Sequence, residues 1–153
     1  MRRGRPGEAR HDFPSDRPPS DPLIDSHIFF WAIDAPKHLS AAERDILDDS
    51  RVDVAVSVAS CWELSIKLAK GMLRLGPGKA EIGSDYFVRQ AGIAGFAVLS
   101  IDPPEAEYVR VLPYIHRDPV DRVIIAQAMR SGPTIMTRDA VFGRYPDVQV
   151  IAS

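Results

Sequence analysis

Short apolar segments with the character of β-strands alternate with helical segments along most of the chain. The strand-type segments are PLID (22–25), DVAVS (53–57), FAVLSI (96–101), TIMT (134–137) and VQVIA (148–152). The intervals between them hold apolar residues at helical spacing. Strands that are separated by helices form parallel sheets whose two faces are both covered. The alternation therefore predicts an α/β fold with a central parallel sheet between helices.

Two of the helical segments carry a start or stop signal. Ser40 and Glu43 have the spacing of a capping box, which predicts a helix over AAERDILDDS. Gly71 follows ASCWELSIKLAK and is expected to end that helix as a C-cap. We expect this second helix to present an apolar stripe formed by Trp62, Ile66 and Ala69.

The first 21 residues differ in composition from the rest of the chain. They contain no Val, Leu or Ile and are interrupted by prolines, which predicts a disordered tail over residues 1–21. The remaining residues, 22–153, are expected to form one domain, because 45% hydrophobic and 26% charged residues are ordinary values for a chain that buries a core.

No membrane or secretory segment is expected. No apolar run reaches the roughly 18 residues that a membrane span needs, and no apolar stretch follows the N-terminal arginines as in a secretory signal. The single cysteine, Cys61, cannot form an internal disulfide, which fits a reducing compartment. We therefore expect a cytoplasmic protein.

The charge balance does not by itself favour nucleic-acid binding. Residues 1–21 carry five arginines and four acidic residues, which leaves 14 basic and 17 acidic residues for the remainder. A domain that binds nucleic acid by charge alone is expected to be basic. Binding would need a local basic rim, for which the candidates are Lys67, Lys70, Arg74, Arg117, Arg122 and Arg138.

Four acidic residues, Asp25, Glu63, Asp121 and Asp139, lie at or just past the end of apolar segments. In a parallel sheet the chain leaves every strand at the same edge, so acids that are far apart in the sequence can meet there. A cluster of carboxylates repels itself unless a cation joins it. Mg²⁺ and Mn²⁺ prefer oxygen ligands, and carboxylate-held Mg²⁺ serves phosphodiester chemistry.

Three of these acids also have ordinary local roles. Asp25 can cap the helix that follows it, alone or while binding a metal. Glu63 precedes Lys67 by four residues, the favourable order for a helical ion pair. Asp139 follows TR before a short helix and can cap that helix.

The helix in RDPVDRVIIAQAMRSG supplies the fourth acid. Asp118 is the expected N-cap, Pro119 the first helical residue, and Gly132 lies beyond the end. Asp121 lies in the first turn, where the helix dipole favours a negative charge. We therefore expect Asp121 to be the metal ligand and Asp118 to be a cap or a supporting residue.

Other catalytic patterns are missing from the sequence. The four histidines show no paired spacing with Cys61, which argues against zinc; they are His11, His27, His38 and His116. GPGKA lacks the form of a phosphate-binding P-loop, and no Ser-His-Asp grouping is visible.

Four segments occur in a characteristic order: LIDSH near the start, SVASCWELSIKLAKGML in the middle, then HRDPVDRVIIAQA, and TRDAVFGRYPDVQVI at the end. Together they resemble the PIN domain, specifically the VapC-type toxins of bacterial and archaeal toxin–antitoxin pairs. The resemblance runs from about Leu23 to Ile151. It implies a three-layer α/β/α sandwich with a parallel sheet, which agrees with the segment order.

The resemblance also implies a function. The active-site positions of the family correspond to Asp25, Glu63, Asp121 and Asp139 here. It implies a metal-dependent endoribonuclease in which Asp25, Asp121 and Asp139 hold one or two Mg²⁺ or Mn²⁺ ions, while Glu63 positions or deprotonates the attacking water. The implied partners are an RNA substrate and a VapB-type antitoxin, which would lay a helical tail on the toxin and direct an Arg toward the acids. We also expect a homodimer.

Three alternatives stay open at this point. The chain could be a PIN nuclease of RNA processing that has no antitoxin, or a degenerate binding module without activity, although the presence of all four acids argues against decay. An aspartyl-phosphate phosphohydrolase would need a second Asp two residues after the nucleophile Asp25, where this chain has His27.

Overall fold

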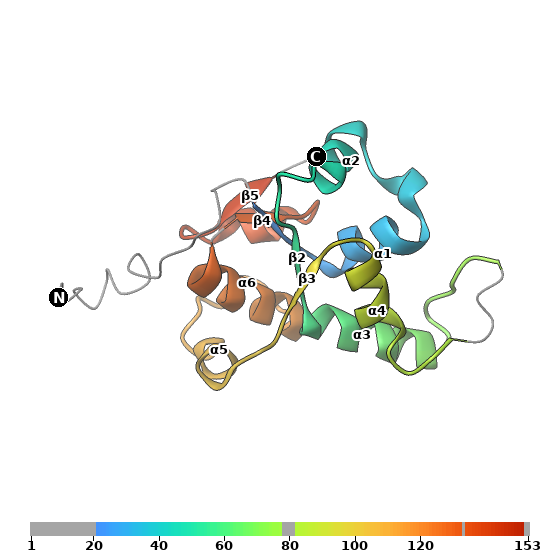
Figure 1. Ribbon diagram of the computed structural model, residues 1–153. Helices are drawn as coiled ribbons and strands as arrows, with labels where there is room; N and C mark the ends of the chain where they lie inside the picture. The colour runs from blue at the N-terminus through green and yellow to red at the C-terminus, as the bar shows by residue number, and fades with distance from the viewer. Residues whose placement is uncertain (1–20, 78–81, 133, 152–153) are drawn as a thin grey trace.

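The structure is a computed structural model that describes residues 21–77, 82–132 and 134–151 (Figure 1). Residues 1–20 of the expected tail and the end of the last expected strand lie outside the described residues. Five strands form one parallel sheet in the order β3-β2-β1-β4-β5. Their bounds are β1 Leu23–Ile24, β2 Ala55–Ser57, β3 Ala97–Leu99, β4 Thr134–Met136 and β5 Gln149–Ile151. The predicted α/β fold is confirmed.

Helices connect the strands and cover the sheet (Figure 1). They are α1 Ser26–Asp34, α2 Ala41–Asp48, α3 Val58–Ala69, α4 Tyr86–Ile93, α5 Pro103–Tyr108 and α6 Pro119–Ser131, with short 3-10 helices η2 Pro36–His38 and η3 Ala140–Arg144. Within the described ranges, none of the helices has the length and apolar character to cross a membrane.

The three central strands, β2, β1 and β4, are buried on both faces, as expected for parallel strands. Successive strand residues point to opposite faces, so Leu23 packs in one core while Ile24 packs in the other. Ile135 and Met136 of β4 divide in the same way. The first core lies against α5, α6 and η3, and the second against α1, α2 and α4, which gives the three-layer sandwich.

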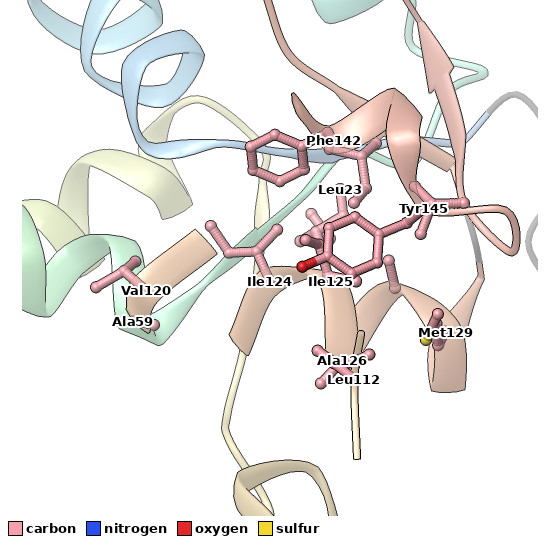
Figure 2. Close-up of a cluster of buried hydrophobic side chains, with 14 residues drawn as sticks. Leu23, Ala59, Leu112, Val120, Ile124, Ile125, Ala126, Met129, Phe142 and Tyr145 are labelled. Carbon is pink, nitrogen blue, oxygen red and sulfur yellow. The ribbon is translucent and has the colours of Figure 1, made fainter. Parts of the chain in front are cut away.

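The first core joins the segments that carry two of the candidate acids. Figure 2 shows Tyr145 and Phe142 gathered with Leu23 over Ile124 and Ile125 of α6. All five side chains are at most 1% exposed. Burial of such a side chain contributes roughly 1.5–3 kcal/mol, so η3 and the residues after it are held firmly on α6.

The boundary signals of α2 and α3 are confirmed. Ser40 and Glu43 form the reciprocal capping box at the start of α2. Gly71 has a φ of +70°, and the amides of Gly71 and Met72 donate to the carbonyls of Leu68 and Lys67. This is the Schellman arrangement that ends helices.

The apolar stripe of α3 does not form the buried side of this helix. Trp62 is 62% exposed and Ala69 is also exposed. The buried side of α3 is formed instead by small residues and one leucine, namely Ala59, Ser60, Cys61 and Leu64. Small side chains allow α3 to approach α1 and α6, which both contact it.

The packed part of the chain includes Asp21, which the composition had assigned to the tail. This residue is 2% exposed, and its Oδ1 accepts a hydrogen bond from the amide of Asp53 at 3.1 Å. The folded region therefore begins at least one residue earlier than expected.

The strand order places a topological switch point between β1 and β4. The chain proceeds from β1 to β2 and β3 on one side, then returns to form β4 and β5 on the other side of β1. In open parallel sheets, ligands bind outside the carboxyl ends of the strands at such a point. Asp25 directly follows β1, and Asp139 lies three residues beyond β4.

Candidate active site

Asp25 is the N-cap of α1. Its Oδ1 accepts a hydrogen bond from the amide of Ile28 at 2.9 Å, and its Oδ2 accepts one from the hydroxyl of Thr137. The residue is only 4% exposed. The capping role considered for Asp25 is therefore real, and the second carboxylate oxygen is turned toward the end of β4.

A pair of buried serines joins the start of α1 to the helix that carries Glu63. The hydroxyl of Ser26 donates to that of Ser60 at 2.8 Å, and Ser60 lies one turn before Glu63 on α3. The side chain of Glu63 is 14% exposed, and its Oε1 lies 3.9 Å from Nζ of Lys67. The expected helical ion pair is present.

Asp118 has the capping role that the sequence predicts for it. Asp118 is the N-cap of α6, with Oδ1 accepting from the amides of Val120 at 2.8 Å and Asp121 at 3.3 Å. Pro119 and Gly132 begin and follow the helix as expected. The Asp121 carboxyl does not cap the helix, and its Oδ2 lies 3.1 Å from Nε2 of His116.

Asp139 caps η3 and is linked to Asp25 through a shared neighbour. Its Oδ1 accepts from the amide of Val141 at 3.0 Å, and its own amide donates to the hydroxyl oxygen of Thr137 at 3.0 Å. Since the same hydroxyl donates to Asp25, Thr137 connects the backbone amide of Asp139 to the carboxylate of Asp25.

His116, whose spacing from the other histidines and Cys61 predicts no zinc site, is part of this cluster. Its Nε2 lies 2.9 Å from Oδ2 of Asp139 and 3.1 Å from Oδ2 of Asp121. These three residues can offer ligand atoms within 4.8 Å of one another. The available signal was the position of His116 two residues before the N-cap Asp118, whose helix begins beside the acids.

The carboxyl groups repel one another. Burial raises the pKa of Asp121 to about 8, and the charges of its neighbours add to the rise in the order Asp118, Asp25, Glu63 and Asp139. Burial also raises the pKa of Asp25, although hydrogen bonds from Ile28 and Thr137 offset part of the rise. Asp25, Glu63 and Asp139 therefore lie close enough to Asp121 for their charges to raise its pKa.

The composition of this cluster suits a hard divalent cation. Its donors are carboxylate oxygens, which Mg²⁺ and Mn²⁺ prefer, and a cation would relieve the repulsion that adds to the effect of burial on the pKa of Asp121. The side chains of Asp121 and Asp139 are 18% and 39% exposed, so the cluster is open to an ion and to a substrate.

Three residues of the expected basic rim are engaged elsewhere. Arg122 is 9% exposed and donates to backbone carbonyls rather than facing solvent. Arg138 pairs with the buried Glu43, donates to the His38 carbonyl and lies over the Trp31 ring at 4.6 Å. Lys67 pairs with Glu63. The exposed remainder of the expected rim is Lys70, Arg74 and Arg117.

Comparisons with known proteins agree with this architecture. Two solved structures with similar folds are VapBC2 from Rickettsia felis bound to a DNA fragment from its promoter (TM-score 0.60, 16% identity, 85% of this chain and 96% of the other covered) and FitAcB from Neisseria gonorrhoeae (0.53, 20%, 84% and 95%). A third is FitAB bound to an IR36 DNA fragment (0.58, 22%, 85% and 93%). No curated protein sequence gives a significant match. Residues 23–148 match the family model of the PIN domain, and since this range spans most of the chain, the protein belongs to the PIN domain family.

Proposed function

We propose that the protein is a metal-dependent endoribonuclease that acts as the toxin of a toxin–antitoxin pair. The observation that carries the proposal is the convergence of Asp25, Glu63, Asp121 and Asp139 at the switch point of the sheet, where burial raises the pKa of Asp121 to about 8 and the charges of the neighbouring carboxyl groups add to the rise. PIN domains are generally nucleases, and the similar solved structures are of VapBC and FitAB complexes.

Asp25, Asp121 and Asp139 are the residues that would hold Mg²⁺ or Mn²⁺. When bound, the cation would polarise the scissile phosphate and stabilise the charge that develops during displacement. Asp121 would release its proton on becoming a ligand, since a metal-bound carboxylate is ionised. Glu63 lies on α3 at the edge of the cluster, from where its carboxylate would orient or deprotonate the attacking water.

The cleavage test compares three charge-removing variants. Asp25→Asn and Asp121→Asn should each abolish Mg²⁺-dependent cleavage of RNA, with melting temperature and circular dichroism showing an intact fold. Asp118→Asn is the matched control. Oδ1 of Asp118 already accepts a hydrogen bond from the first turn of α6, and asparagine caps helices as well as aspartate does. Cleavage by the first two variants at the wild-type rate would refute the assignment.

The proposed antitoxin would cover apolar surface near α1, α3 and α4. Trp62, Met72 and Ile93 are 62%, 68% and 73% exposed. A hollow of about 540 Å³ between α1 and the segment after α3 is lined in part by Phe30 and Leu75. An amphipathic helix of VapB type is the kind of partner that fills such a surface, and a homodimer would use apolar surface that the antitoxin leaves exposed.

Growth assays separate a toxin from a processing nuclease. Expression of the chain alone should arrest growth, and co-expression with the small protein encoded beside it should restore growth. Asp25→Asn should not arrest growth. Unimpeded growth in the presence of folded protein that cleaves RNA in vitro would leave the nuclease activity standing and refute the toxin role.

A further inference from the structure

Both ring nitrogens of His116 are engaged, and each faces a different kind of partner. Nδ1 accepts a hydrogen bond from the amide of Asp118 at 3.2 Å. Nε2 lies within hydrogen-bonding distance of the Oδ2 atoms of Asp139 and Asp121, at 2.9 and 3.1 Å. Because a nitrogen that accepts from an amide carries no proton, the ring proton stands on Nε2 and is shared between the two carboxylates.

The ring is held in this orientation from three directions. The amide of His116 donates to the hydroxyl oxygen of Tyr145 at 2.9 Å, and that hydroxyl donates to the carbonyl of Pro113 at 3.0 Å. Arg122 donates to the carbonyl of His116 at 3.3 Å. The Phe142 ring meets the imidazole edge to face, with centroids 5.2 Å apart. Tyr145 and Phe142 are themselves fixed in the first core (Figure 2).

Arg122 fastens the whole loop that ends at His116. Its Nη2 donates to the carbonyl of Val109 at 2.6 Å and its Nη1 to that of Pro113 at 3.2 Å. The residue itself is 9% exposed. A buried guanidinium that is satisfied by several carbonyls of one loop leaves that loop little freedom. The structure therefore contains a preformed support for the imidazole.

We propose that His116 is a positioning residue of the metal site and not a metal ligand. Its Nε2 proton holds the Oδ2 atoms of Asp121 and Asp139 at one point, so that the two carboxyl groups, one from α6 and one from the end of β4, keep a common orientation. Nδ1 directs its lone pair at the Asp118 amide, and Nε2 carries the proton, so the ring has no lone pair for a cation. This inference rests on the proposed function, which makes the two carboxylates cation ligands.

Two substitutions of His116 separate positioning from ligation. The amide nitrogen of glutamine can reach roughly the position of Nε2, whereas that of asparagine reaches only the position of Nδ1. His116→Gln should therefore retain Mn²⁺ affinity within about threefold of the wild type, as measured by isothermal titration calorimetry. His116→Asn should weaken binding by about 10- to 100-fold, which is typical when a group that orients a metal ligand is lost. Melting curves in EDTA check that both variants are folded.

Spectroscopy reports the role of the ring directly. In long-range ¹⁵N–¹H spectra of the metal-free protein, the histidine signals that are absent from His116→Gln should show a protonated Nε2 and an unprotonated Nδ1. Electron spin-echo spectra of the Mn²⁺-loaded wild type should show no directly coordinated nitrogen. The opposite tautomer, a nitrogen bound to Mn²⁺, or wild-type affinity in His116→Asn would each overturn the role of His116. A wild type that binds no Mn²⁺ would instead overturn the proposed function, and the positioning role with it.

Discussion

Replacing Asp121 with asparagine should stabilise the metal-free protein above pH 8 and leave its stability nearly unchanged near pH 4. Burial and neighbouring carboxyl groups raise the pKa of Asp121 from 3.8 to about 8 in the folded state. A carboxyl whose pKa is higher when folded binds more protons in the folded state than in the unfolded state. The free energy of unfolding therefore falls as the pH rises from about 4 to about 8 and is flat beyond that range.

The magnitude follows from the size of the shift. Each pKa unit corresponds to about 1.4 kcal/mol, so the whole shift corresponds to roughly 6 kcal/mol. The Asp121 side chain is 18% exposed, and water that reaches the carboxylate weakens the repulsion. We expect Asp121→Asn to gain on the order of 2 to 4 kcal/mol at pH 8.5. Asparagine keeps the size of the side chain and an oxygen that can accept from His116.

Urea denaturation in EDTA at pH 4.5 and pH 8.5 measures this difference. Asp45→Asn serves as the control, because it removes one negative charge from an exposed position of α2 and should change stability by less than about 0.5 kcal/mol at either pH. An equal effect of Asp121→Asn at both pH values, or a loss of stability at pH 8.5, would refute the conclusion that the folded state disfavours the ionised form of Asp121.

Three further predictions concern the cation and the fold. Because Asp121 loses its proton on binding a cation, Mn²⁺ affinity measured by calorimetry should rise by up to about tenfold per pH unit between pH 6 and pH 8, and a pH-independent affinity would contradict this. Gly71→Ala should lower the free energy of unfolding in urea by about 1 kcal/mol because the φ of Gly71 is +70°, although a Cβ would meet nothing within 4 Å. Gly92→Ala is the matched control, since Gly92 lies in helix α4 with equally open space around it. This substitution should raise the free energy of unfolding by roughly 0.5–1 kcal/mol. Arg138→Ala should cost roughly 1–3 kcal/mol, since it removes the guanidinium that donates to the buried Glu43 and lies over Trp31, with Arg138→Lys intermediate.

Local chemistry made most of the fold predictable from the sequence. The capping box at Ser40 and Glu43, the glycine at position 71 and the Asp118–Pro119 start of α6 each act through neighbouring backbone groups. Signals of this kind do not depend on the rest of the fold. The strand segments were also found, because a strand buried on both faces is a short apolar run.

The parts that the sequence could not supply depend on contacts between distant segments. Arg122 looks like a surface charge until the loop from Val109 to His116 folds back and directs its carbonyls at the guanidinium. His116 becomes part of the site only through Tyr145, which lies 29 positions further along the chain. Trp62 has the spacing of a core residue, yet the closeness of α3 to its neighbours selects the side with small residues.

Capping and the proposed cation binding are compatible in this cluster, which explains how four acids can share one crevice. The carboxylates of Asp25 and Asp139 each accept a backbone amide at a helix start, and their second oxygens accept from Thr137 and His116. These donors hold both carboxylates in place before any cation arrives. Asp121 caps nothing, lies among the other charges and has its pKa raised to about 8, so at neutral pH it keeps a proton. Cation binding would then replace that one proton with the metal. The orientation of the carboxyl groups would not need to change, because the capping hydrogen bonds at the helix starts and His116 have already set it.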